Sequence, residues 1–197
     1  MKETLLLLMA TAAFPQTIAD AERERAVRYL ESTRDQFLEL TSKLTDAQYR
    51  WKPAPERWSV AECAEHITAT EQFIFARFEK ALEEPPKPEK KVAAAGRDEL
   101  ILKAVPNRTR RVQAPEEVQP AGRWPAREAQ KKAFEETRGR SLEFARSSRA
   151  DLRSYFYPHF ILGDLDLYQW TLFLGAHCER HLAQMREVIA DPTFPKP

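Results

Sequence analysis

The 197 residues suffice for one well-packed domain and are too few for two large ones. Charged residues make up 31% of the chain and the formal net charge is +1, so no basic excess points to a nucleic acid as partner. Two cysteines exclude a disulfide framework and a cysteine zinc cluster, and no run of 18 apolar residues predicts a transmembrane helix. We expect both thiols to be free core residues.

The first 19 residues predict either a signal peptide or an N-terminal extension that packs on the domain. Residues 1–14, MKETLLLLMATAAF, contain a lysine, a short apolar run and then small residues, which is the order of a secretory signal. We expect a periplasmic or secreted protein if residues 1–19 are such a signal, and a cytoplasmic protein otherwise.

Helical periodicity begins after this segment and predicts the first two of four long helices. Apolar residues three and four positions apart predict a helix from Asp20 to Leu44. A second helix is predicted from Ser59 to about Leu82, because Ser59 and Glu62 have the spacing of a capping box. His66 lies two turns into this second helix, at the margin of its apolar face.

Residues 84–124 are predicted to form a long crossover. This stretch is rich in proline and basic residues, so we expect it to be largely irregular, with one short helix near 98–103. Connections of this length are often lids or partner surfaces. A solvated crossover along the length of the domain is an equally good interpretation.

The remaining sequence predicts two more long helices. Pro125 is well placed as the first residue of a helix that ends near Leu152. Residues 155–163, YFYPHFILG, are predicted to form an aromatic loop that contains His159. Asp166 and Gln169 then have capping-box spacing at the start of the last helix. Residues 191–197 are expected to form a C-terminal tail.

The last helix contains two histidines in a pattern that is typical of metal sites. His177 and His181 are four residues apart, so they lie one turn apart on one face, where their imidazoles can converge on a single ion. His66 supplies a third histidine from another helix. The spacing leaves two interpretations open, a metal site and histidines that are satisfied within the core or at the surface.

Four long helices with one long connection predict an all-α four-helix bundle. The chain also resembles a known family, the DinB-like metal-binding four-helix bundles. The resemblance covers residues 20–190 and rests on WKPAPERWSVAECAEH at 51–66, YPHFILG at 157–163 and HCERHLAQ at 177–184. It implies an up-down-down-up order of the helices, which agrees with a long crossover between the second and the third.

The resemblance also implies that His66, His177 and His181 bind one divalent metal ion. His159 matches a histidine of the family that we expect near the pocket rather than among the ligands. Zinc is the expected ion, with nickel, iron and manganese as alternatives, because sites made only of imidazoles discriminate poorly between metals. The extended crossover departs from compact family members and changes the expected shape of the pocket.

Three imidazoles leave coordination positions open, which is typical of a catalytic site. The reactive group would be a metal-bound water or a thiolate, and the sequence does not identify a catalytic side chain. Glu62, Glu65 and Glu179 lie close to the ligands in sequence, and we expect Glu62 and Glu179 as contacts of a ligand or of the pocket.

Two classes of function remain. The resemblance extends to a branch of metal-dependent hydrolases and of bacillithiol- and mycothiol-type thiol transferases, which favours a metal-dependent enzyme. Its substrate would be a small molecule such as a low-molecular-weight thiol. The alternative is a non-catalytic envelope or stress-related protein that the ion stabilises. A homodimer is compatible with either class.

Overall fold

The computed structural model describes residues 17–196, so most of the segment predicted as a signal lies outside the described residues. The long helices are α1 (Asp20–Ser42), α3 (Val60–Glu83), α6 (Arg127–Ser147) and α7 (Leu167–Ile189). The short helices are α2 (Asp46–Arg50), η1 (Pro88–Lys90), α4 (Lys91–Ala94), α5 (Arg97–Ala104) and η2 (Glu116–Val118). The strands are β1 (Phe156–His159) and β2 (Gly163–Asp166).

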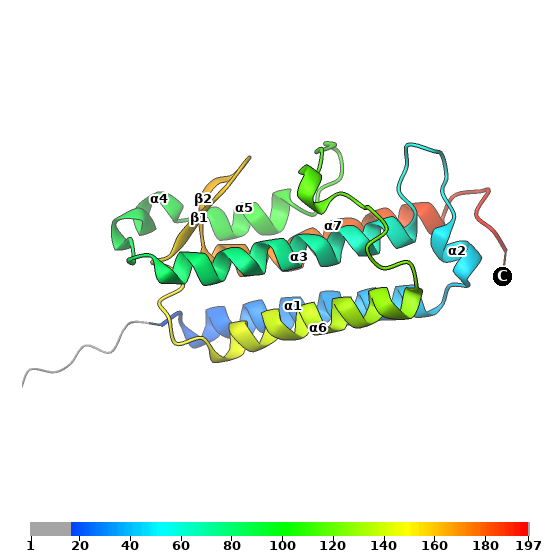
Figure 1. Ribbon diagram of the computed structural model, residues 1–197. Helices are drawn as coiled ribbons and strands as arrows, with labels where there is room; N and C mark the ends of the chain where they lie inside the picture. Colours follow the sequence, from blue (N-terminus) through cyan, green and yellow to red (C-terminus); the bar gives the residue numbers. More distant parts are fainter. Residues whose placement is uncertain (1–16, 197) are drawn as a thin grey trace, which may run out of the picture.

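The long helices form the predicted four-helix bundle. Helix α1 packs against α6 and α7, and α3 packs against the same two helices. In Figure 1, α1 and α7 run in one direction and α3 and α6 in the other, which confirms the up-down-down-up order. Because α3 and α6 are parallel, residues 84–126 must return along the length of the bundle before α6 can begin.

The crossover is more ordered than the sequence predicts. The expected short helix near 98–103 is α5, and a further helix, α4, precedes it. Helix α5 packs along α7, and its Ile101 is fully buried in the core. Figure 1 shows α5 on the side of α3 and α7 that faces away from α1 and α6. The first half of the crossover is therefore packed against the outside of the bundle and contributes to its core.

The prediction of a loop for residues 155–163 is wrong for residues 156–159 and 163, because β1 and β2 form an antiparallel hairpin there and only residues 160–162 are its turn. His159 pairs with Gly163, which has a φ of 73°, in the left-handed region that glycine adopts without strain. The indole of Trp170 donates to the backbone oxygen of Tyr157 at 2.9 Å and ties the hairpin to α7. Strand β2 leads directly into the N-cap of α7, Asp166.

Helix α6 begins and ends inside the bounds predicted from Pro125 to Leu152. Its N-terminal cap is Ala126, in an extended conformation, so Pro125 lies outside the helix. At the other end, the Arg23 guanidinium donates to the backbone oxygens of Ala145, Arg146 and Ser148. These contacts satisfy carbonyls that the next helical turn would otherwise use, and the helix ends there.

Ile18 is buried against the bundle, so the folded domain begins before residue 20, where the sequence placed its boundary.

Cys63 and Cys178 are buried and free, which confirms the prediction of core thiols. Within residues 17–196, no helix is long and apolar enough to span a membrane.

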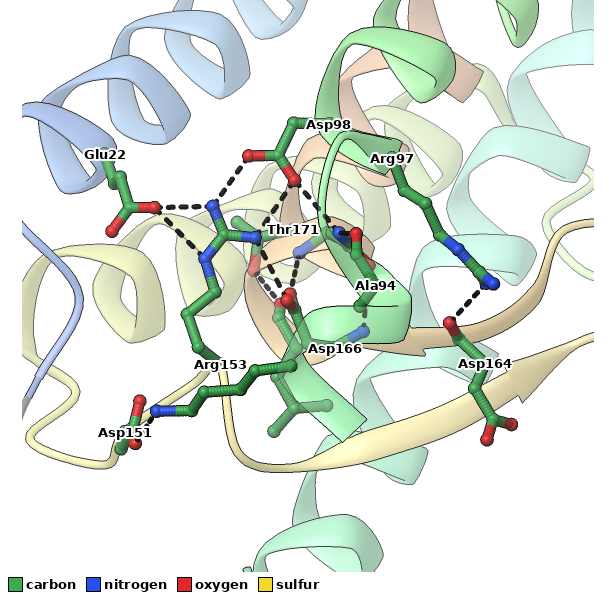
Figure 2. A network of polar contacts seen from close by, with 12 residues as sticks. Glu22, Ala94, Arg97, Asp98, Asp151, Arg153, Asp164, Asp166 and Thr171 are labelled. Atoms are coloured by element: carbon green, nitrogen blue, oxygen red, sulfur yellow. Dashed lines mark hydrogen bonds and ion pairs between the residues drawn. The ribbon is translucent and has the colours of Figure 1, made fainter. Parts of the chain in front are cut away.

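Arg153, in the connection between α6 and β1, joins three helices at the end of the bundle where α1 begins (Figure 2). Its guanidinium contacts Glu22 of α1 at 2.5 Å, Asp98 of α5 at 2.6 Å and Asp166 at 3.0 Å. Burial raises the pKa of Asp166 to about 6, although Arg153 favours its charged form. The network fixes the packed half of the crossover to the start of α7.

We expect Gly175→Ala to destabilise the bundle. A Cβ added at Gly175 would lie 2.5 Å from the ring of Tyr29, so α1 and α7 would have to move apart. Overpacking of this kind costs about 1–3 kcal/mol. Gly139→Ala in α6 is the matched control, because nothing lies within 4 Å of its added Cβ. That change should stabilise the chain by about 0.5–1 kcal/mol. Thermal melting of both variants tests the pair, and a common direction of shift would contradict the prediction.

Candidate metal centre

The structure brings His66, His177 and His181 together between α3 and α7. One ring nitrogen from each lies within 4.8 Å of the other two. The Nε2 atoms of His66 and His177 are 3.1 Å apart. His66 and His181 are 3% and 7% exposed, and His177 is half-buried. The three side chains therefore form one largely buried cluster with a single more accessible member.

Local sequence sets these positions. The hydroxyl of Ser59 accepts the Glu62 N–H at 3.1 Å, and the Glu62 carboxylate accepts the Ser59 N–H at 2.7 Å. This capping box fixes the residue at which α3 begins, and it therefore fixes the face of the helix on which His66 lies. Residues four apart on α7 project from the same face, which places His177 and His181 beside each other.

The crossover accepts a hydrogen bond from the outer nitrogen of His66, by which we mean the ring nitrogen that does not face the other two histidines. Its Nδ1 lies 2.7 Å from the backbone oxygen of Val118, which can only accept, so Nδ1 carries the proton and donates. In the neutral ring, Nε2 then keeps its lone pair and points toward the other histidines.

The outer nitrogen of His181 is fixed in the same way by two side chains. Its Nδ1 lies 2.9 Å from Oε1 of Gln184, and Arg108 donates to the same oxygen at 3.1 Å. An arginine cannot accept, so the shared amide atom is the oxygen. His181 therefore donates through Nδ1 and has a free Nε2.

Burial keeps the cluster neutral. It lowers the pKa of His66 to about 4. The pKa values of His177 and His181 lie well below the ordinary range, because burial and the neighbouring histidines both disfavour a positive charge. Neutral imidazole is the form that binds metals, so the cluster is in its ligating state at pH 7.

Aromatic rings flank the histidines on two sides. The ring of Trp58 lies 4.9 Å from that of His66 and 6.0 Å from that of His181. Phe173 stacks on His177 at 5.6 Å. Rings in these positions restrict the motion of the imidazoles and limit the access of water from both sides.

The donor set fits one divalent first-row ion. With Zn–N bonds of 2.0–2.1 Å, two nitrogens of a tetrahedral site are about 3.3 Å apart, close to the separation of the His66 and His177 nitrogens. In His66 and His181 the outer N–H donates a hydrogen bond to an oxygen of the protein, which is the usual arrangement around a metal-ligating histidine. The residues present therefore suit an ion held by three imidazoles.

Comparison with known proteins gives the family. A model described as the DinB superfamily matches residues 29–185, which is more than half of the chain. The chain belongs to the DinB superfamily. The uncharacterized protein YuaE of Bacillus subtilis (strain 168) is 26% identical over 145 residues, which cover 74% of this chain and 85% of YuaE.

A solved structure has the same fold. It is YfiT from Bacillus subtilis, described as a probable metal-dependent hydrolase with an unusual four-helix bundle topology. The match has a TM-score of 0.56 and 14% sequence identity, and it covers 88% of this chain and 89% of YfiT. At this identity the likeness establishes the four-helix bundle fold alone.

The glutamates that lie near the histidines in this DinB sequence are engaged elsewhere. Glu62 serves the capping box and also contacts Lys52 at 2.8 Å. Glu179 accepts a hydrogen bond from Tyr29 of α1. Glu65 binds backbone N–H groups of residues 121–123. The structure therefore gives Glu62 and Glu179 roles in helix capping and helix packing, and neither hydrogen-bonds to a histidine.

The groups that orient the histidines were not identified from the sequence. Gln184 lies three residues after His181, on the same face of α7, so helical spacing could have suggested it. Val118 acts through its backbone and Arg108 comes from the crossover, and no local pattern indicates either of them.

An open groove of about 680 Å³ between α3 and α6, lined by Gln72 and Trp124 among others, contains none of the histidines.

His159 lies outside the cluster formed by His66, His177 and His181. Its Nδ1 accepts the N–H groups of Ile161 and Leu162 at 3.0 and 3.1 Å, which shapes the hairpin turn. Its ring packs 4.9 Å from Phe173, which in turn stacks on His177. His159 therefore reaches the histidine cluster only through an aromatic ring.

We expect His159 to lower stability in acid. Burial lowers its pKa to about 4, below the value of about 6.5 expected for an unfolded chain. The unfolded state therefore binds more protons as the pH falls below about 6.5, and the folded state loses about 2 kcal/mol from this group by pH 5. His159→Asn keeps an acceptor near the position of Nδ1 and removes the titration. The free energy of unfolding would be measured with chelator at pH 7.5 and at pH 5. Its decrease between the two pH values should be about 2 kcal/mol smaller in His159→Asn than in the wild type. Parallel pH profiles would contradict this.

Proposed function

We propose that this protein is a metal-dependent hydrolase in which His66, His177 and His181 bind one divalent ion, with zinc as the first choice. The observation that carries the proposal is the convergence of three neutral imidazoles whose nitrogens lie within 4.8 Å. The description of YfiT as a probable metal-dependent hydrolase supports it, because the two chains share a fold.

The chain's own residues prepare the site for such a role. A zinc ion bound by three imidazoles keeps coordination positions open and lowers the pKa of a bound water to about 7. Val118 and Gln184 hold two imidazoles in the required tautomer. Trp58 and Phe173 restrict water around the rings and lower the local dielectric, which strengthens electrostatic interactions with a bound substrate.

Thiol transfer is a second candidate, and one observation favours it. Hydrolysis benefits from a general base, yet the carboxylates of Glu62, Glu65 and Glu179 are all held by other partners. Transfer of a low-molecular-weight thiol needs no separate base if the site lowers the pKa of the thiol. The substrate in either case would be a small molecule.

A substrate panel separates the candidates. The zinc-loaded protein would be assayed with esters, amides and phosphoesters, and separately with a low-molecular-weight thiol and an electrophile. Hydrolysis that disappears with chelator, returns with zinc and is absent in His177→Ala would support the proposal. Turnover that requires the thiol would support transfer instead. A full complement of metal without either activity would leave the non-catalytic alternative.

A further inference from the structure

The second half of the crossover, residues 105–123, crosses from α7 to α3 on the side of the bundle where the histidines lie. We call this segment the strap. In Figure 1 it follows α5, passes over α3 and α7, and then crosses α3 to reach the start of α6. Val118 in η2, within the strap, is buried against the bundle.

The first end of the strap is anchored on α7. The Arg180 guanidinium donates to the backbone oxygens of Val105 at 3.2 Å and Arg110 at 2.8 Å, and also to that of Asn107. Arg108 forms two hydrogen bonds with the carboxylate of Glu187, at 2.7 and 2.8 Å. Side chains of one helix face thus hold residues 105–110.

The other end is anchored on α3 by one carboxylate. Glu65 accepts the N–H groups of Ala121, Gly122 and Arg123 at 2.7 to 3.1 Å, and the Arg123 guanidinium at 2.8 Å. Four hydrogen bonds to one carboxylate therefore hold residues 121–123 against α3.

The middle of the strap is held far less firmly than its ends. Residues 109–113, 116 and 117 are exposed, and residues 114 and 115 are half-buried. Chain segments with few buried contacts open at a low free-energy cost. The order of this part therefore depends on the two anchored ends.

One end of the strap contacts the outer nitrogen of His66 directly, and the other end is linked to that of His181 through Gln184. The Val118 backbone oxygen accepts from His66 Nδ1, and Arg108 shares the Gln184 oxygen with His181 Nδ1. We propose that the strap positions two metal ligands from its two ends, with Arg108 as a positioning residue that acts through Gln184. Metal affinity and the order of the strap are then reciprocally coupled.

The coupling follows from linkage. If the anchored strap holds two imidazoles in their ligating tautomer and orientation, it raises metal affinity, and a bound ion must stabilise the anchored strap by the same factor. Changes to the outer partners of metal ligands typically cost 10–100-fold in metal affinity. The inference rests on the proposed metal centre but not on the reaction that it performs.

Zinc affinity, measured by competition with a chromophoric chelator, tests the positioning role. Arg108→Met and Gln184→Leu should each weaken zinc binding about 10- to 100-fold. Their combination should be no weaker than Gln184→Leu alone, because both act through one oxygen. Gln184→Glu keeps an acceptor for His181 Nδ1, so it should bind zinc at least as tightly as the wild type. Arg111→Met is the matched control, because Arg111 lies in the exposed middle of the strap and its loss leaves both anchored ends intact, so it should change affinity less than about threefold.

Tryptic cleavage after Arg110 and Arg111 tests the order of the strap. Saturating zinc should slow cleavage at these sites at least tenfold in the wild type and much less in Arg108→Met, as followed by mass spectrometry. Equal cleavage with and without zinc, or equal zinc affinity in Arg108→Met and Arg111→Met, would overturn the inference. A wild type that binds no zinc would instead overturn the metal centre itself.

Discussion

Replacing His177 by alanine is expected to abolish stoichiometric binding of a divalent metal. His177 supplies one of three converging nitrogens, and two imidazoles form a much weaker site than three. Loss of an outer partner alone costs 10–100-fold in affinity, so loss of a ligand should cost at least about 100-fold. Metal analysis of the purified protein and competitive zinc titration would measure both effects. His66→Ala should behave in the same way, although its ligand comes from the other helix.

His159→Asn is the matched control for this prediction. It also changes a buried histidine close to α7, but His159 is separated from His177 by the ring of Phe173. Its zinc affinity should therefore stay within about threefold of the wild type, since no ligand or outer partner is altered. A full complement of metal in His177→Ala, or its loss in His159→Asn, would show that the ion binds elsewhere.

The long helices could be predicted because their signals are local. The starts of α3 and α7 follow from capping boxes that the structure contains, Ser59 with Glu62 and Asp166 with Gln169. The convergence of His177 and His181 follows from helical geometry alone. That His66 joins them depends on how α3 packs against α7, which the sequence supplied only through its resemblance to a family.

The remaining features depend on contacts between segments far apart in sequence. The end of α6 is set by Arg23, more than a hundred residues away. The hairpin takes its place from Trp170, and the strap takes its course from Glu65 and Arg180. No periodicity or motif within those segments encodes such partners. The end of α6, the hairpin and the course of the strap were therefore beyond sequence analysis, whereas the long helices and the three histidines were not.

The clearest such contact is an ion pair at the centre of the bundle. Arg138 of α6 is 0% exposed, and two of its nitrogens bind the buried carboxylate of Glu71 at 2.8 to 3.1 Å. Its third nitrogen donates to the backbone oxygen of Leu30 and to the hydroxyl of Thr33, both at 2.8 Å. Burial opposes the charge of Arg138, but Glu71 outweighs it and holds the pKa of the guanidinium above its ordinary value.

Glu71→Leu should therefore destabilise the protein strongly. It leaves a guanidinium without its counter-charge inside the bundle, and breaking a buried pair in this way costs about 3–5 kcal/mol. For a domain of this size, the melting temperature should fall by roughly 6–20 °C, at about 2–4 °C per kcal/mol. Thermal and urea unfolding would measure the loss.

The double variant Glu71→Leu with Arg138→Met separates the cost of an unpaired charge from the value of the pair. It removes both charges and fills the space with apolar groups, so most of the lost stability should return, because replacing a buried pair is often neutral or stabilising. Arg25→Met serves as the surface control. Arg25 and its partner Glu99 have side chains that are 42% and 75% exposed, so their loss should cost less than about 1 kcal/mol. If the double variant were no more stable than Glu71→Leu, the bonds of Arg138 to Leu30 and Thr33 would carry the stability, and the unpaired charge would not explain the loss.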